Sequence, residues 1–167
     1  MLAIRTILHP TDFSEPSANA FRMACALARD YSANLIVLHV LQRPILHYAG
    51  VMTAPPPTPT PEERQAAIHK LHAVDPTDRL IAVEHLFEEG DPATGILQTA
   101  RERRCDLIVM GSHGRSGLGR VLMGSVAENV LRGAVCPVLT VKTLALEARK
   151  GQRAAPRAAE EAAEVAR

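Results

Sequence analysis

The chain has 167 residues, 47% of them apolar and 22% charged, and a formal net charge of +1 at pH 7. This length favours one domain with a real core, and the charge gives no electrostatic argument for binding nucleic acid or an anionic membrane. Tryptophan is absent and aromatic residues make up 3% of the chain, which argues against a surface that stacks the bases of single strands.

The cysteines and the N-terminus indicate the cellular compartment. Cys25, Cys105 and Cys136 are far apart and form no CxxC pair, so we expect free, small buried side chains rather than disulfides or a zinc site. The first residues do not look like a signal peptide, and no apolar run approaches the roughly 18 residues of a membrane span. We therefore expect a cytoplasmic protein.

The first part of the chain alternates strand and helix patterns. Ile4–His9 is an apolar run that we expect to end at Pro10, because proline cannot continue a central ladder. A turn over Thr11–Ser14 follows, with Ser14 as the cap of a helix. That helix has an apolar stripe made of Ala20, Phe21, Ala24, Leu27, Ala28 and Tyr31. Leu35–Val40 is almost wholly apolar, as in a strand covered on both faces.

The middle of the chain opens with a proline-rich segment. Residues 43–61 end in APPPTPTP, which predicts an extended surface loop that acts as a stiff connector rather than as a ligand for another domain. Glu62–Val74 then has the pattern of a short helix, and Leu80–Phe87 that of a strand. Asp91 and Pro92 are typical of a helix start, and the inner face of that helix includes Ile96, Leu97 and Ala100.

The last part of the chain repeats the alternation and then changes composition. We expect strands at Leu107–Met110 and Val138–Val141, with a helix over Ser125–Arg132 between them that ends at Gly133. Residues 144–167 are rich in Ala, Glu and Arg, which predicts a solvated helix or a disordered tail outside the core. The domain is therefore expected to span residues 1–143.

Five alternations of strand and helix predict the α/β class, namely a three-layer, Rossmann-like fold with a five-stranded parallel sheet and helices on both faces. In such sheets ligands bind beyond the carboxyl ends of the strands. The turns over His9–Ser14, after Val40 and over Gly111–Ser125 all follow strand ends there. We expect the three to converge on one crevice.

A set of spaced glycines in one of these turns indicates what the crevice binds. Gly111, Gly114 and Gly124, with Ser125 after the last, lie between an apolar strand and a helix start. Such spacing suits a main chain that wraps phosphate groups and delivers them to the unpaired amides of a helix N-terminus. The P-loop pattern GxxxxGK[ST], GxGxxG, HExxH and GxSxG are all absent.

The unbroken pattern G-x2-G-x9-G-S resembles the phosphate loop of the universal stress protein family, in its ATP-binding branch. The flanking SHGR, GSVAE and CPV segments and the opening ILHPTDFS add to the likeness, which covers residues 3–142. The resemblance implies an adenine nucleotide alpha hydrolase-like fold. It also implies binding of ATP, AMP or ADP with Mg²⁺ or Mn²⁺, and a homodimer formed through the last strand, Val138–Val141.

The site residues that the motif and the resemblance imply lie in four segments: Pro10, Thr11 and Asp12; Val40; Met110, Gly111, His113, Gly114 and Arg115; and Gly124, Ser125 and Val126. Asp12 is expected near adenine and any divalent cation, unless it only forms the turn. Val40 is expected to present its backbone to the adenine edge. Ser125 with Glu128 also fits a plain capping box, and His113 fits a surface loop histidine.

Three functions remain open on the sequence. The first is a nucleotide-binding module that signals cellular state without dedicated catalysis. The second is a slow ATPase or self-phosphorylating protein, for which Ser125 and Asp12 are present but no clear general base. The third is a nucleotide-free member of the same family that works through protein contacts alone, against which the intact glycine spacing speaks.

Overall fold

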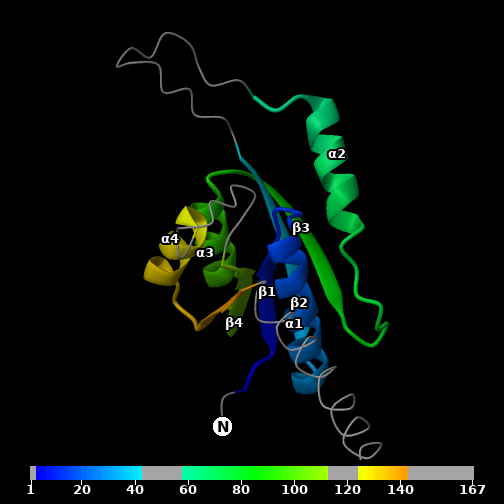
Figure 1. The fold of residues 1–167 in the computed structure, drawn as a ribbon, viewed down its shortest axis with the longest axis vertical. Helices are drawn as coiled ribbons and strands as arrows, with labels where there is room; N and C mark the ends of the chain where they lie inside the picture. The colour runs from blue at the N-terminus through cyan, green and yellow to red at the C-terminus, as the bar shows by residue number, and fades with distance from the viewer. Residues whose placement is uncertain (1–2, 43–57, 113–123, 143–167) are drawn as a thin grey trace, which may run out of the picture.

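The computed structural model describes residues 3–42, 58–112 and 124–142. Within them strand and helix alternate as predicted (Figure 1), in the order β1 (Thr6–Pro10), α1 (Glu15–Tyr31), β2 (Asn34–Gln42), α2 (Pro61–His72), β3 (Val83–Gly90), α3 (Pro92–Glu102), β4 (Leu107–Gly111), α4 (Ser125–Gly133) and β5 (Val138–Val141). Most of the predicted proline-rich loop, the phosphate-loop residues His113, Gly114 and Arg115, and the tail lie outside the described residues.

The five strands form one parallel sheet in the order β3-β2-β1-β4-β5. The chain moves outward from β1 through β2 to β3, and then crosses back to add β4 and β5 on the other side of β1. The direction of winding therefore reverses between β1 and β4, and their carboxyl ends border the crevice at which such sheets bind ligands. The predicted fold class is confirmed.

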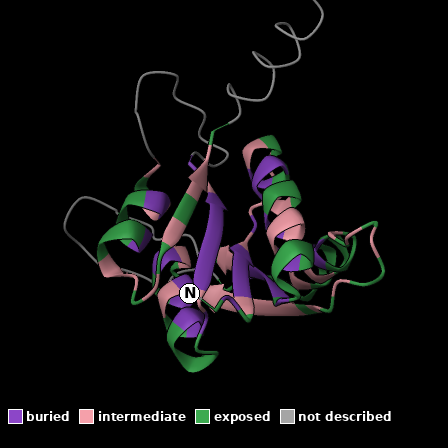
Figure 2. Cartoon of the chain, turned by 90° about the horizontal axis from the view of Figure 1, so that it is seen from below, coloured by how far each residue is buried: buried purple, intermediate pink, exposed green. Residues whose placement is uncertain are grey.

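Helices cover both faces of the sheet (Figure 1). Ile7, Leu35 and Val37 pack in one core cluster with α1 and α2. Leu8 and Leu38, which alternate with them, pack in a second cluster with α3 and α4. Figure 2 shows the buried interior strands between these helical layers. Because both faces of the inner strands are buried, β1, β2 and β4 consist mainly of apolar residues instead of alternating with polar ones.

The predicted caps of two helices are confirmed. The Ser14 hydroxyl accepts a hydrogen bond from the Ser17 amide at 3.4 Å, and Asp91 accepts one from the Thr94 amide at 2.9 Å. Each capping residue directly precedes a helix that has proline in its first turn. The capping side chain accepts a hydrogen bond from an amide that has no partner within the helix. Both helices start at the carboxyl edge of the sheet, so their caps fix the loops that border the crevice.

Two expectations about exposed residues were wrong. Strand β3 runs over Val83–Gly90 and not over Leu80–Phe87, because the Asp78 carboxylate accepts a bond from the Leu80 amide and closes a turn there. Leu80 is 91% exposed. The apolar stripe of α1 excludes Tyr31, which is exposed in the last turn, while the alanines at 20, 24 and 28 form the buried row against the sheet.

Gly133 does not end α4 in the way we predicted. It is the last residue of the helix, and Ala134 follows in an extended conformation rather than in the left-handed one typical of a glycine cap. A Cβ atom at Gly133 would lie 2.7 Å from Cδ1 of Leu97 on α3. The glycine therefore allows α3 and α4 to pack closely.

The three cysteines are free thiols, as expected, but only Cys105 is buried, whereas Cys25 and Cys136 are half-buried. Burial raises the pKa of Cys105 to about 12 and that of Cys25 to about 11, so both stay protonated and unreactive near neutral pH. Among the helices in the described ranges, none combines the length and the apolar character needed to cross a membrane.

Candidate functional site

The end of β4 and the start of α4 lie side by side at the crevice. The Gly124 amide donates to the Ser112 carbonyl at 2.8 Å, and the Ser112 amide donates to the Val141 carbonyl of β5 at 3.1 Å. Met110 and Gly111 are the last residues of β4. The structure thus brings both described ends of the predicted phosphate loop together, although the residues between them lie outside its described part.

Helix α4 begins without a side-chain cap. Gly124 occupies the N-cap position in an extended conformation, and within the described part of the chain no side chain forms a capping hydrogen bond there. The predicted capping box of Ser125 and Glu128 is therefore wrong: Ser125 is already inside the helix, and the Glu128 carboxylate pairs with Arg132 at 2.8 Å. The first helical hydrogen bond runs from the Glu128 amide to the Gly124 carbonyl at 2.9 Å. The preceding amides form the positive end of the helix dipole.

The loop after β1 holds Asp12 firmly. The Ser14 hydroxyl donates to Oδ1 of Asp12 at 2.5 Å, and the Ser14 amide donates to the same oxygen at 3.1 Å. Between them Phe13 has a φ of 64°, in the left-handed region that costs a bulky residue energy. The turn-forming role that we considered for Asp12 is thus present, and it fixes the carboxylate beside the crevice.

Val40 presents its main chain to the crevice. The carbonyl of Leu38 in β2 faces β1 and accepts a hydrogen bond from the Thr11 amide at 2.8 Å. Alternation along a strand turns the amide and carbonyl of Val40 to the same side. The pairing of β1 with β2 ends at Pro10 and Leu38, so these groups of Val40 lie beyond the last paired residue of β1. The amide and carbonyl of Val40 therefore face the space beyond the end of the β1–β2 pairing.

Two buried histidines support the same strand ends. Nδ1 of His9 lies 2.8 Å from the Val109 carbonyl of β4, and Nδ1 of His39 lies 2.7 Å from the Thr11 carbonyl. Burial lowers the pKa of His9 to about 4, although the bond to Val109 and the charge of Asp12 act in the opposite direction. Both histidines are buried, and the sequence alone did not reveal the bonds that they make.

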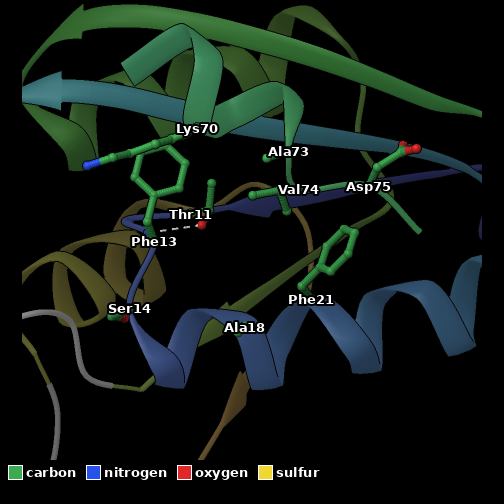
Figure 3. Close-up of a pocket in the computed structure, with 9 residues that line it drawn as sticks. All are labelled: Thr11, Phe13, Ser14, Ala18, Phe21, Lys70, Ala73, Val74 and Asp75. Atoms are coloured by element: carbon green, nitrogen blue, oxygen red, sulfur yellow. Dashed lines mark hydrogen bonds between the residues drawn. The ribbon is translucent and has the colours of Figure 1, made fainter. Parts of the chain in front are cut away.

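A cavity of about 440 Å³ opens beside this site, between α1 and α2 (Figure 3). Its lining consists of Thr11, Phe13, Ser14, Ala18, Phe21, Lys70, Ala73, Val74 and Asp75. Lys70 and Asp75 lie at opposite ends of the lining in Figure 3. Among the predicted site residues in the described ranges, only Thr11 lines this cavity. The cavity is therefore a neighbour of the crevice between β1 and β4 and does not coincide with it.

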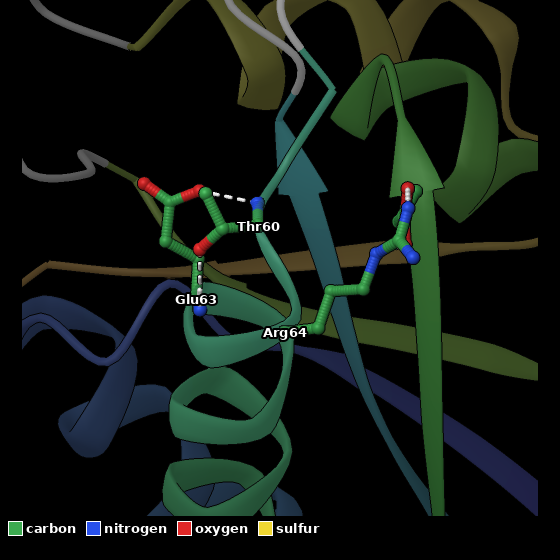
Figure 4. A network of polar contacts seen from close by, with 4 residues as sticks. Thr60, Glu63 and Arg64 are labelled. Carbon is green, nitrogen blue, oxygen red and sulfur yellow. Dashed lines mark hydrogen bonds and ion pairs between the residues drawn. The ribbon is translucent and has the colours of Figure 1, made fainter.

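Helix α2 is fixed at the same edge of the sheet (Figure 4). Thr60 and Glu63 form a capping box, with bonds of 2.8 and 3.2 Å between each side chain and the other residue's amide. Nη2 of Arg64 donates to Glu89 of β3 at 3.2 Å, and its Nε forms an ion pair with the same carboxylate at 2.6 Å. These contacts tie the start of α2 to the carboxyl end of β3.

The described residues contain no group of three or more His, Cys, Asp or Glu side chains placed to hold a metal ion. Of the side chains predicted for the site, Asp12 offers the carboxylate that a divalent cation prefers. A cation here would therefore need oxygen ligands from a bound phosphate as well.

Comparison with known proteins gives consistent matches. The model of the universal stress protein family matches residues 3–142. Universal stress protein MJ0531 of Methanocaldococcus jannaschii is 33% identical over 142 residues, which cover 83% of this chain and 82% of that protein. A universal stress protein of Thermus aquaticus is also 33% identical, over 83% of this chain and 98% of its own length.

Solved structures are similar over the same region. The structure of MJ0577 from M. jannaschii superposes with a TM-score of 0.65 at 27% identity, covering 84% of this chain and 96% of the other. A universal stress protein in complex with cAMP superposes with a TM-score of 0.63 at 25% identity, over 84% of this chain and 98% of that one.

Proposed function

Because the chain belongs to the universal stress protein family, we propose that it is a nucleotide-binding module that takes ATP, or AMP or ADP, in the crevice between β1 and β4. The observation that carries the proposal is the uncapped start of α4 at Gly124, beside the end of β4. A helix N-terminus without a capping side chain offers its amides to a polyanion. The relative solved with cAMP supports an adenine nucleotide as the ligand class.

Each described segment of the crevice has a role in this proposal. Main-chain groups of Val40 would contact the adenine edge, and Asp12 would lie near the nucleoside. Gly111 and Gly124 would admit phosphate where a side chain would block it, and the Ser125 hydroxyl would donate to a phosphate oxygen. Mg²⁺ or Mn²⁺, bound by phosphate oxygens and Asp12, would neutralise phosphate charge. His113, Gly114 and Arg115 complete the proposed loop on sequence grounds.

We propose binding without dedicated catalysis. Phosphoryl transfer needs a group that activates the nucleophile and charges that clamp the transferred phosphate. Oδ1 of Asp12 already accepts two bonds from Ser14, and His9 is buried with a pKa of about 4, so neither is well prepared as a general base. We also propose that the module works in the cytoplasm, which its free thiols favour.

The test compares two valine variants of the same helix. Gly124 has a φ of −73° and a ψ of 150°, a conformation that valine adopts without backbone strain, so Gly124→Val places a branched side chain at the proposed phosphate position. Asn129→Val places the same side chain on an exposed position of α4. We expect calorimetric titration with Mg-ATP to show saturable binding by the wild type and by Asn129→Val. Gly124→Val should bind at least tenfold more weakly.

Three results would contradict the proposal in different ways. A wild type that shows neither heat of binding nor a thermal shift at millimolar ATP would favour the nucleotide-free interaction protein. Unchanged affinity in Gly124→Val would contradict the assignment of the loop. ADP release by the wild type well above that of a Gly124→Asp control would favour a slow ATPase.

We further propose a homodimer through β5. Within the described sheet β5 is an edge strand that pairs with β4 alone. Exposed apolar side chains lie on it and on the connection that precedes it, with Leu139 exposed by 37% and Val135 by 66%. An unpaired apolar edge favours association with a second copy.

A further inference from the structure

Strand β1 ends in a histidine followed by a proline, His9 and Pro10. We infer that His9 is a positioning residue for the nucleotide: its imidazole replaces the backbone hydrogen bond that Pro10 cannot donate, and so holds the end of β4 against β1. This inference rests on the proposed function, because the crevice between these two strand ends is the proposed nucleotide site.

The strand pairing shows where a donor is missing. Thr11 donates its amide to β2, so the alternation of the strand turns the backbone nitrogen of Pro10 toward β4. Proline has no N–H, and the pairing of β1 with β4 ends at Leu8 and Ile108. The next carbonyl of β4 on this side belongs to Val109. A donor from β1 is needed there, because a buried carbonyl without a hydrogen-bond partner is destabilising.

His9 supplies that donor from the adjacent position. A carbonyl oxygen only accepts, so the ring nitrogen 2.8 Å from it, Nδ1, carries the proton. The lone pair of the ring then lies on Nε2, which has no hydrogen-bond partner among the described residues. The ring is 0% exposed and packs 5.4 Å from the ring of Phe21 on α1. Packing and the single bond together fix the imidazole in one orientation.

His39 repeats the arrangement on the other side of β1. Its Nδ1 donates to the Thr11 carbonyl at 2.7 Å, just after the last paired residue of β1. Its ring also lies 4.3 Å from the ring of Phe13, which follows Asp12. Two imidazoles therefore extend the hydrogen bonding of β1 beyond its ladder. The main chain of Pro10 and that of Val40 lie beside these bonds, at the crevice.

The experiment uses variants that keep or remove the donor. In His9→Asn the amide nitrogen stands about where Nδ1 was, whereas His9→Leu has a similar size and no donor. His85 is the matched control, because it bonds the Val74 carbonyl from β3 at 2.9 Å, away from the crevice. We expect His9→Leu to bind Mg-ATP at least tenfold more weakly than the wild type. His9→Asn and His85→Leu should stay within about threefold.

A double variant tests the replacement directly and remains informative if His9→Leu folds poorly. Adding Pro10→Ala to His9→Leu restores a backbone N–H opposite Val109, so the unfolding midpoint in urea should recover toward the wild type. Tight binding by His9→Leu, an equal loss in His85→Leu, or no recovery in the double variant would overturn the inference. A wild type that binds no ATP would instead overturn the proposed function.

Discussion

At the scale of single residues, His9 makes the stability of the fold depend on pH. Its pKa is about 4 in the folded protein, against an ordinary 6.5. As the pH falls from about 6.5 to about 4, the unfolded chain takes up a proton that the folded chain refuses. Stability therefore decreases over this window, by about 3 kcal/mol when the whole shift is counted, and is regained as the pH rises.

Urea unfolding measured between pH 7.0 and pH 4.5 checks this prediction. His9→Asn has no titrating group at this position and keeps the bond donor, so its stability should fall less steeply over the same window. Carboxylates and the other histidines contribute equally to both proteins and cancel in the comparison. Parallel curves for the two proteins would show that His9 is not the group responsible.

At the scale of the elements, Gly95 controls how closely α3 approaches β2. A Cβ atom there would lie 2.9 Å from Oε2 of Glu88 and 3.0 Å from Cγ2 of Val40. The Glu88 carboxylate also accepts a bond from Thr99 at 2.9 Å, which limits its freedom to move aside. Alanine at position 95 would therefore press on the residue whose main chain we propose for adenine contact.

We expect Gly95→Ala to destabilise the protein by about 1 kcal/mol, because overpacking outweighs the helix propensity that alanine adds. The ATP affinity should also fall, by about three- to tenfold. Arg101→Ala, at an exposed position of the same helix, is the control for an alanine that makes no packing contact. Calorimetric titration and urea unfolding of both variants give the answer. A more stable Gly95→Ala with full affinity would show that the contact relaxes freely.

The accuracy of the sequence-based predictions also differs by element. Local signals were sufficient for the strands and for the caps at Ser14 and Asp91, since each depends on neighbours a few residues away. The start of β3 depended on a turn at Asp78 that an imperfect alternation does not reveal. At α4 the serine looked like a cap, but the glycine before it takes that position.

The candidate site was predicted through its motif, and its supporting bonds were not. Asp12 and Gly124 stand at loop and helix starts that the chain order itself indicates, once the sheet is parallel. The partner of His9 is Val109, 100 residues further along the chain. Such a contact follows from strand order and register, and no local pattern in the sequence contains either.

At the scale of the whole molecule, the strand order separates the proposed nucleotide site from the proposed dimer edge. Winding reverses between β1 and β4, which puts the proposed nucleotide site at the middle of the sheet. The two edges are β3 and β5. Arg64 of α2 pairs with Glu89 on β3, so a charged contact is present at that edge. The apolar side chains exposed around β5 make it the edge that we propose for a second copy.

This arrangement predicts that one charge at β5 produces monomers with an intact site. We expect Leu139→Lys to sediment near 18.0 kDa and the wild type near twice that mass. If two β5 strands paired in the dimer, the lysine introduced by Leu139→Lys would bury an ammonium group without a partner, which would destabilise the dimer. Leu80→Lys, before β3, is the control and should sediment as the wild type. Leu139→Lys should still bind ATP, because the proposed site lies within one chain. A monomeric wild type, or a Leu139→Lys variant that remains dimeric, would refute this interface.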